Sequence, residues 1–204
     1  MSRKSHWDTV YEGKLDNAVS WYQSKPELSL KLITGSGVSH SGSIIDVGGG
    51  ASLLVDYLVQ DGFENTTVLD ISGAALRVAQ KRLGENAKYV DWIEADITRF
   101  QYAKTFALWH DRAVFHFLTE APDRKKYINL LHKATRPGGH VIIAAFAIGG
   151  PEKCSGLDIV QYDAAKLSRE LGETFILVEQ ADETHITPGG KVQAFGYYRF
   201  KKQG

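Results

Sequence analysis

The chain has 204 residues, of which 43% are hydrophobic and 24% are charged, a composition typical of a globular protein with a substantial core. Lysine plus arginine and aspartate plus glutamate number 24 each, so there is no net positive charge to favour a nucleic-acid partner. No apolar run reaches the ~18 residues of a membrane span, and the single cysteine, Cys154, excludes an internal disulfide and fits a reducing, cytoplasmic setting.

The first 42 residues precede the first predicted strand and are too short to fold as a domain of their own. We expect them to form a helical segment that lies over the core as a lid. Residues 34–43 are the most linker-like piece of the sequence. The whole chain, residues 1–204, is therefore predicted to be one domain with its sheet core at residues 43–204.

From residue 43 onward, apolar strand patterns alternate with helical patterns. Strands are expected at 43–47, 65–72, 87–96, within 106–118 and at 140–147, and helices at 52–62, 73–85, 121–139 and 163–173. Two last strands, 174–187 and 191–201, follow each other without a helix, which predicts antiparallel neighbours. The pattern predicts an α/β fold with one doubly wound, mostly parallel seven-stranded sheet that ends in an antiparallel pair.

The first predicted strand ends at three consecutive glycines, Gly48, Gly49 and Gly50, which are followed by a helix. Glycines cost backbone entropy, and the N–H groups of such a turn suit a polarised ligand. A dinucleotide fingerprint would need glycine where Leu53 stands, and Asp46 before the turn would repel a pyrophosphate but attract an ammonium group. The turn therefore favours a zwitterionic ligand, such as an amino acid attached to a nucleoside.

The next two strands also end in acidic residues, and ligands of such sheets bind beyond the carboxyl ends of the strands. Asp70 is placed to accept both hydroxyls of a ribose, and Asp96 could accept from the amine of an adenine. Ile71 and Ile97 would then lie on the two sides of the base. The fourth strand ends in the polar cluster of residues 109–117, close to where a reacting group would project.

The segments DVGGG, VLDIS, EADIT and RPGGHVIIAAF, in this order, resemble the class I S-adenosylmethionine-dependent methyltransferases. The resemblance implies a Rossmann-like fold, with the glycine turn beside the methionine moiety, Asp70 on the ribose and Asp96 on the adenine amine. S-adenosylmethionine is accordingly the expected cofactor. The residues expected to hold it are Asp46, Gly48, Gly49, Gly50, Asp70, Ile71, Asp96, Ile97 and His110.

The segment HWDTVYEGKLDNAVSWYQ near the start of the chain is similar to the entry segment of small methyltransferases related to protein lysine methyltransferases. That segment lies over the cofactor in such enzymes, so Tyr11, Trp21 and Tyr22 are candidates for an acceptor-binding wall. His116 and Cys154 are further candidates for this wall, although a buried histidine or cysteine more often serves packing.

The candidate catalytic residues are His110, Asp111 and Arg112, which are consecutive at the end of the fourth strand. His110 or Asp111 could take a proton from an ammonium acceptor. Arg112 could bind an acceptor carboxylate, or could instead pair with Asp111. No histidine, cysteine or carboxylate spacing matches a metal site, and we expect no metal.

The expected function is methyl transfer from S-adenosylmethionine to an unidentified acceptor. A small molecule is slightly favoured because the core carries no large insertion for docking a macromolecule. A protein lysine is the close alternative, and a cofactor-binding protein without catalysis is a lesser one. Leu53 argues against a nicotinamide-dependent reductase. No nucleic-acid or membrane partner is expected, and the oligomeric state is left open.

Overall fold

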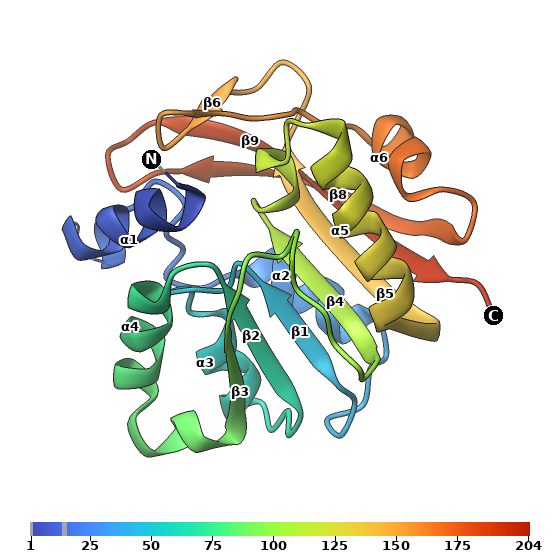
Figure 1. Ribbon diagram of the computed structural model, residues 1–204, viewed down its shortest axis with the longest axis horizontal. Coiled ribbons are helices and arrows are strands. Elements are labelled where there is room, and N and C mark those ends of the chain that lie inside the picture. The colour runs from blue at the N-terminus through green and yellow to red at the C-terminus, as the bar shows by residue number, and fades with distance from the viewer. Residues whose placement is uncertain (1, 14–15) are drawn as a thin grey trace.

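A computed structural model describes residues 2–13 and 16–204 of the chain (Figure 1). Seven strands form one sheet in the order β3-β2-β1-β4-β5-β9-β8. The strands are β1 (Ile44–Val47), β2 (Thr66–Asp70), β3 (Val90–Glu94), β4 (Phe106–Arg112), β5 (Thr135–Phe146), β8 (Phe175–Ile186) and β9 (Val192–Lys202). The strands β1 to β5 are parallel, and β9 runs antiparallel to both β5 and β8. The predicted doubly wound sheet with its antiparallel end is confirmed.

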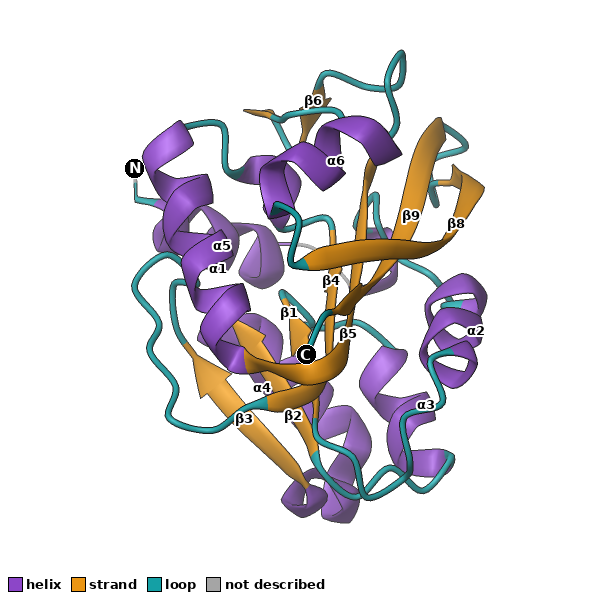
Figure 2. Ribbon diagram, turned by 90° about the vertical axis from the view of Figure 1, so that its right-hand side faces the viewer, coloured by secondary structure: helices purple, strands orange, loops and turns teal. Residues whose placement is uncertain are grey.

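Helices cover both faces of this sheet (Figure 2). They are α1 (Arg3–Gly13), α2 (Glu27–Gly35), α3 (Leu54–Gln60), α4 (Gly73–Leu83), α5 (Ala121–Ala134) and α6 (Ala164–Leu171), with short 3-10 turns η1 (Asp16–Ala18), η2 (Gly84–Tyr89) and η3 (Phe115–Phe117). Buried side chains of α5 and α6 pack on one face of the sheet, and those of α2 and α3 pack on the other. None of the described helices has the length and apolar character that crossing a membrane requires.

Strand β4 shows how the sheet separates neighbouring residues. Trp109 lies in the apolar cluster of α5, whereas Leu108 lies in that of α2 and α3. Successive side chains of a strand point to opposite faces, so His110 and Arg112 share the face of Leu108, and Asp111 shares that of Trp109. Both faces are covered by helices, which explains why residues 141–146 of β5 read as a continuous apolar run in the sequence.

The structure corrects the end of the third predicted helix and the start of the strand that follows it. The helix expected at 121–139 ends at Ala134, and Pro137 lies inside the long strand β5. Proline is tolerated near the start of a strand, where few ladder hydrogen bonds are lost. A small hairpin formed by β6 (Lys153–Cys154) and β7 (Leu157–Asp158) was not expected, because two-residue strands leave no periodic pattern.

Candidate functional site

Two adjoining cavities lie at the carboxyl ends of β1, β2 and β4. The larger has an empty volume of about 790 Å³ and the smaller about 560 Å³, their open mouths included. The residues that line both are Tyr11, Trp21, Gly48 and Arg112. The two cavities therefore form one continuous site that joins at these four residues.

The larger cavity contains the two acidic strand ends and both isoleucines predicted for a nucleoside, Asp70, Asp96, Ile71 and Ile97. The Oδ1 of Asp70 accepts from the backbone N–H of Ser72 at 2.8 Å, and burial raises the pKa of Asp70 to about 7. The Oδ1 of Asp96 accepts from the backbone N–H and the hydroxyl of Thr98 at 2.9 and 2.8 Å. Its Oδ2 has no hydrogen bond to a described residue, so Asp96 can accept from a ligand.

The glycine turn passes directly against the carboxylates. A Cβ on Gly49 would overlap Oδ2 of Asp46, and a Cβ on Gly50 would lie 2.6 Å from Oδ2 of Asp70. Gly48 and Gly50 also have positive φ angles of 71° and 39°, which disfavour other residues. The turn is therefore a cradle that any side chain would fill.

His110 lines the smaller cavity but is not placed as a proton acceptor for catalysis. Its Nδ1 lies 2.7 Å from Oδ1 of Asp46, and its Nε2 lies 2.9 Å from Oγ of Ser29. Both ring nitrogens are thus engaged within the protein, and the residue is 2% exposed. This placement corrects the prediction that His110 takes a proton from the acceptor.

Asp111 faces the α5 side of the sheet and is not among the residues that line either cavity. Its carboxylate accepts from the backbone N–H groups of Val114 and Phe115 and, at 2.6 Å, from the Tyr127 hydroxyl. Burial raises the pKa of Asp111 to about 6. The catalytic prediction for Asp111 is wrong in this structure, because the side chain holds the turn after β4.

Arg112 lines both cavities, and three of its five N–H groups donate to residues of the protein. Its Nε donates to the Tyr197 hydroxyl at 2.7 Å, Nη1 to the Trp21 carbonyl at 3.1 Å, and Nη2 to Glu183 at 3.4 Å. The guanidinium also lies over the ring of Phe195, 4.4 Å from its centroid. Arg112 therefore anchors the segment that carries Trp21, and it pairs with Glu183 instead of Asp111.

Of the residues predicted for the acceptor wall, Tyr11, Trp21 and Cys154 line the larger cavity and Tyr22 lines the smaller one. Burial raises the pKa of the Cys154 thiol to about 11. His116 does not belong to the described lining, because it is fully buried between the rings of Phe117 and Phe146. Burial also lowers the pKa of His116 to about 3. Because its side chain is fully buried and lines neither cavity, the prediction that His116 binds the acceptor finds no support in the described lining.

Four aromatic side chains that line the larger cavity, Trp7, Tyr11, Trp21 and Phe117, form what we call the aromatic wall. Trp7 and Phe117 were not predicted as site residues. Trp7 contacts Trp21 and Phe117 edge-on, with ring centroids 5.6 and 5.1 Å apart, and Tyr11 lies 6.0 Å from Trp21. Arg3, Trp7 and Tyr11 follow one another at four-residue spacing along α1, and all three line the cavity. That spacing was the available signal, since it puts the three side chains on one helix face.

Helix α1 is tied to the strand ends by polar contacts. Asp8 accepts from the Ser72 hydroxyl at 2.6 Å, and Lys4 lies 3.0 Å from Glu94. Arg3 pairs with Asp123 of α5. These contacts hold the helix over the larger cavity.

Two other chemistries find no support in the described residues. A Tyr-x-x-x-Lys sequence typical of some reductases is present at Tyr162 and Lys166. The Lys166 ammonium, however, lies over the Tyr162 ring and donates to the Gln161 carbonyl, and neither residue lines the two cavities. Among residues 2–13 and 16–204, no three histidine, cysteine or acidic side chains gather as a metal site.

A family model described as "Methyltransferase domain" matches residues 44–139, which span β1 to the start of β5 and include both acidic strand ends. Residues 44–139 therefore carry a methyltransferase domain, and the findings together support an S-adenosylmethionine-dependent methyltransferase. EEF1A lysine methyltransferase 2 of Danio rerio is 24% identical to this methyltransferase over 160 residues, 71% of the chain and 69% of that relative.

Solved structures show the same fold. The 1,6-didemethyltoxoflavin-N1-methyltransferase of Burkholderia thailandensis, with 1,6-didemethyltoxoflavin and S-adenosylhomocysteine bound, has a TM-score of 0.72 and 17% identity, covering 98% of this chain and 87% of that one. A structure described for the conversion of a disulfide bond into a thioacetal group during echinomycin biosynthesis has a TM-score of 0.78 and 17% identity, covering 99% of this chain and 93% of that one.

The site residues fit S-adenosylmethionine, which supplies a transferable methyl group on a positively charged sulfur. Asp70 and Asp96 present carboxylate oxygens to the larger cavity, and Ile71 and Ile97 offer apolar contact for a flat base. The glycine turn joins this cavity to the smaller one, where Asp46 offers a negative charge. The aromatic wall suits a cation near the junction.

Replacing Gly49 by alanine is expected to abolish measurable binding of S-adenosylhomocysteine in calorimetric titration. The new Cβ would overlap Asp46 and lie 2.9 Å from the Val68 side chain, so the turn or the carboxylate must move. Gly13→Ala in α1 is a suitable control, because no described atom lies within 4 Å of a Cβ at that position. Wild-type affinity in Gly49→Ala would show that the turn does not approach the cofactor.

Proposed function

We propose that this methyltransferase transfers the methyl group to a small, partly apolar acceptor that binds in the larger cavity beneath the aromatic wall. The observation that carries the proposal is the lining that remains once the nucleoside end is assigned. It includes the rings of Trp7, Tyr11, Trp21 and Phe117, and Cys154 of the β6–β7 hairpin. Aromatic faces of this kind favour flat or apolar groups.

Neither His110 nor Asp111 is placed to take a proton from the acceptor. This supports an acceptor that arrives already deprotonated. Both nitrogens of His110 are engaged, and Asp111 lies on the other face of the sheet. The Cys154 thiol is neutral near pH 7 because burial raises its pKa to about 11. The work of the protein is then to orient the acceptor and to exclude water from it.

A protein lysine is the second candidate for the acceptor. The curated relative from Danio rerio bears the name of a lysine methyltransferase, and an aromatic wall can also bind an ammonium group by cation–π contact.

Nucleic acid and membranes are not proposed as partners, since positive and negative side chains are equal in number. A cytoplasmic location is proposed with either acceptor, on the ground of the single cysteine.

The acceptor class is tested by methyl transfer from radiolabelled S-adenosylmethionine to cell extract divided into a small-molecule filtrate and a macromolecular fraction. We expect label in the filtrate, and much less of it with Asp70→Asn as the enzyme at a cofactor concentration below the wild-type KM. Label found only in the macromolecular fraction, and released as methyl-lysine on hydrolysis, would contradict the small-molecule proposal and favour the second candidate.

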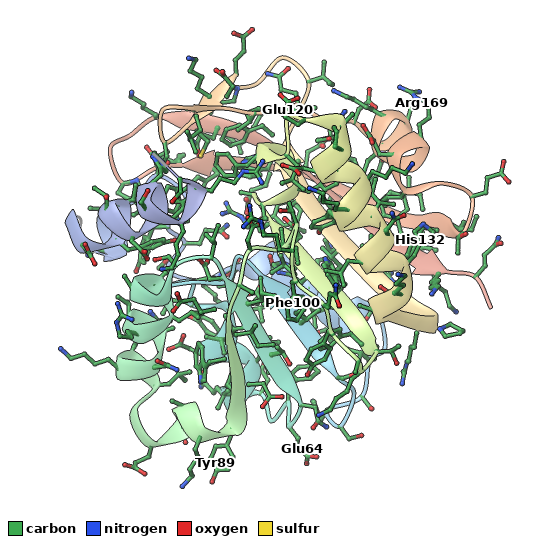
Figure 3. All side chains as sticks on the ribbon, in the orientation of Figure 1. Glu64, Tyr89, Phe100, Glu120, His132 and Arg169 are labelled. Carbon is green, nitrogen blue, oxygen red and sulfur yellow. The ribbon has the colours of Figure 1, made fainter. Side chains whose placement is uncertain are left out.

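Replacing Trp7 by alanine is expected to raise the KM for the labelled filtrate fraction roughly 10-fold, the scale of a lost aromatic contact. Tyr89→Ala serves as the control, since Tyr89 is exposed and lies at the opposite end of the sheet (Figure 3). Steady-state rates at saturating cofactor measure the effect. An unchanged KM would remove Trp7 from the acceptor wall.

A further inference from the structure

A buried chain of three polar side chains underlies the smaller cavity. It runs from Asp46 on β1 through His110 on β4 to Ser29 on α2, with contacts of 2.7 and 2.9 Å. We propose that His110, itself held by Ser29, is a positioning residue that fixes Asp46 so that its Oδ2 receives the ammonium group of the cofactor's amino-acid portion. This inference concerns the cofactor and does not depend on the identity of the acceptor.

The two oxygens of Asp46 have different surroundings. Oδ1 is engaged by the His110 ring, whereas Oδ2 lies beneath Gly49, where a Cβ would overlap it. Asp46, Gly49 and His110 all line the smaller cavity. The absence of a side chain at position 49 thus leaves the Oδ2 edge of the carboxylate open toward the cavity, and the histidine holds the opposite edge.

The hydrogen bonds define the tautomer of His110 that the proposal requires. A carboxylate oxygen can only accept, so Nδ1 must carry the proton that it donates to Asp46. The ring is then neutral if Nε2 accepts from the Ser29 hydroxyl. Asp46 therefore fixes the proton on Nδ1, and the Ser29 hydroxyl, which can donate or accept, satisfies Nε2 and holds the ring.

A neutral donor is suited to this position. Burial without a hydrogen bond would be costly for the Asp46 carboxylate, which is buried almost completely. A cationic partner would satisfy it but would also cancel the negative charge that attracts an ammonium. Arg112, the cation that also lines this cavity, is paired with Glu183 instead.

The test compares two ligands by calorimetric titration. S-adenosylhomocysteine carries the ammonium group, whereas 5′-methylthioadenosine keeps the adenosine and the thioether but lacks the whole amino-acid portion. Wild-type protein should bind S-adenosylhomocysteine more tightly. His110→Phe is expected to weaken S-adenosylhomocysteine roughly 10- to 100-fold, the range for a hydrogen bond to a charged group, and to leave 5′-methylthioadenosine unchanged.

Conservative variants distinguish a role of His110 in positioning Asp46 from a role in packing alone. His110→Asn should recover most of the lost affinity, because its amide N–H can donate to Asp46 in place of Nδ1. Ser29→Ala should weaken S-adenosylhomocysteine alone and by a smaller factor, while Ser168→Ala in the remote helix α6 should weaken neither ligand. If His110→Phe does not fold, the comparison of Ser29→Ala with Ser168→Ala decides whether the chain of hydrogen bonds supports binding of S-adenosylhomocysteine.

Two results would overturn the proposal. One is an equal loss for both ligands in the His110 and Ser29 variants, which would indicate a merely structural role. The other is unchanged binding of S-adenosylhomocysteine in these variants. Failure of the acceptor proposal would leave both binding measurements unaffected.

Discussion

Asp70→Asn is expected to weaken the binding of S-adenosylhomocysteine roughly 10- to 100-fold. Asparagine preserves the shape of the side chain, but its NH₂ group cannot accept a hydrogen bond from a ribose hydroxyl. The carboxylate lies at the end of β2, lines the larger cavity, and is only 6% exposed, so water cannot replace it easily. Calorimetric titration measures the loss, and the exposed Asp61→Asn variant is the control.

The titration of Asp70 is expected to make the affinity for S-adenosylhomocysteine depend on pH. Burial is the main cause that raises the pKa of Asp70 to about 7. The hydrogen bond from the Ser72 backbone opposes this shift, and the nearby negative charges of Asp46 and Asp8 add to it. Accepting from both ribose hydroxyls requires the ionised form, so wild-type affinity should rise as the pH increases through about 7, with release of a proton. In the unliganded protein, the raised pKa gives a stability contribution that is present below the ordinary Asp value of 3.8 and is lost as the pH rises through about 7.

Asp70→Asn should lack this part of the pH dependence, because asparagine does not titrate. The measurement is the affinity for S-adenosylhomocysteine of both proteins across that range. Parallel curves for the two proteins would refute the role of Asp70 at the ribose.

Asp111→Asn is expected to lower the free energy of unfolding by about 3 kcal/mol, which corresponds to roughly 6–12 °C in Tm for a chain of this size. Its carboxylate accepts from two backbone N–H groups and from Tyr127, whose hydroxyl also accepts from the Trp109 indole. The asparagine NH₂ would face a donor in this buried network, and one buried polar group would lose its partner.

Thermal and denaturant unfolding measure the effect, with the exposed Asp91→Asn on β3 as a matched control. Folded Asp111→Asn should bind S-adenosylhomocysteine with wild-type affinity, because the side chain faces α5. A variant of unchanged stability that loses turnover would instead restore the catalytic role expected from the sequence.

The fold and the nucleoside end of the site could be predicted because both follow from local pattern. Alternating strand and helix signals imply parallel strands, and parallel strands bring their carboxyl ends to one edge of the sheet. Asp70 and Asp96 are therefore close in the structure although 26 positions separate them in the sequence. The glycine turn was informative because few other roles require three glycines in succession.

The roles of His110, Asp111 and Arg112 could not be predicted, because their partners are distant in sequence. Strand alternation sends Asp111 to one face and its neighbours to the other. Whether His110 is an open base or an engaged ring is decided by Ser29, which belongs to a helix without any catalytic signal. The aromatic wall also depends on how α1 docks, which the sequence pattern of a short polar helix does not define.

A crystal structure of the chain with S-adenosylhomocysteine tests the central claim most directly. The account predicts the ribose at Asp70, the adenine between Ile71 and Ile97 with its amine at Asp96, and the amino-acid portion beyond the glycine turn near Asp46. A ligand bound elsewhere, with the carboxylates of Asp70 and Asp96 out of its reach, would contradict it.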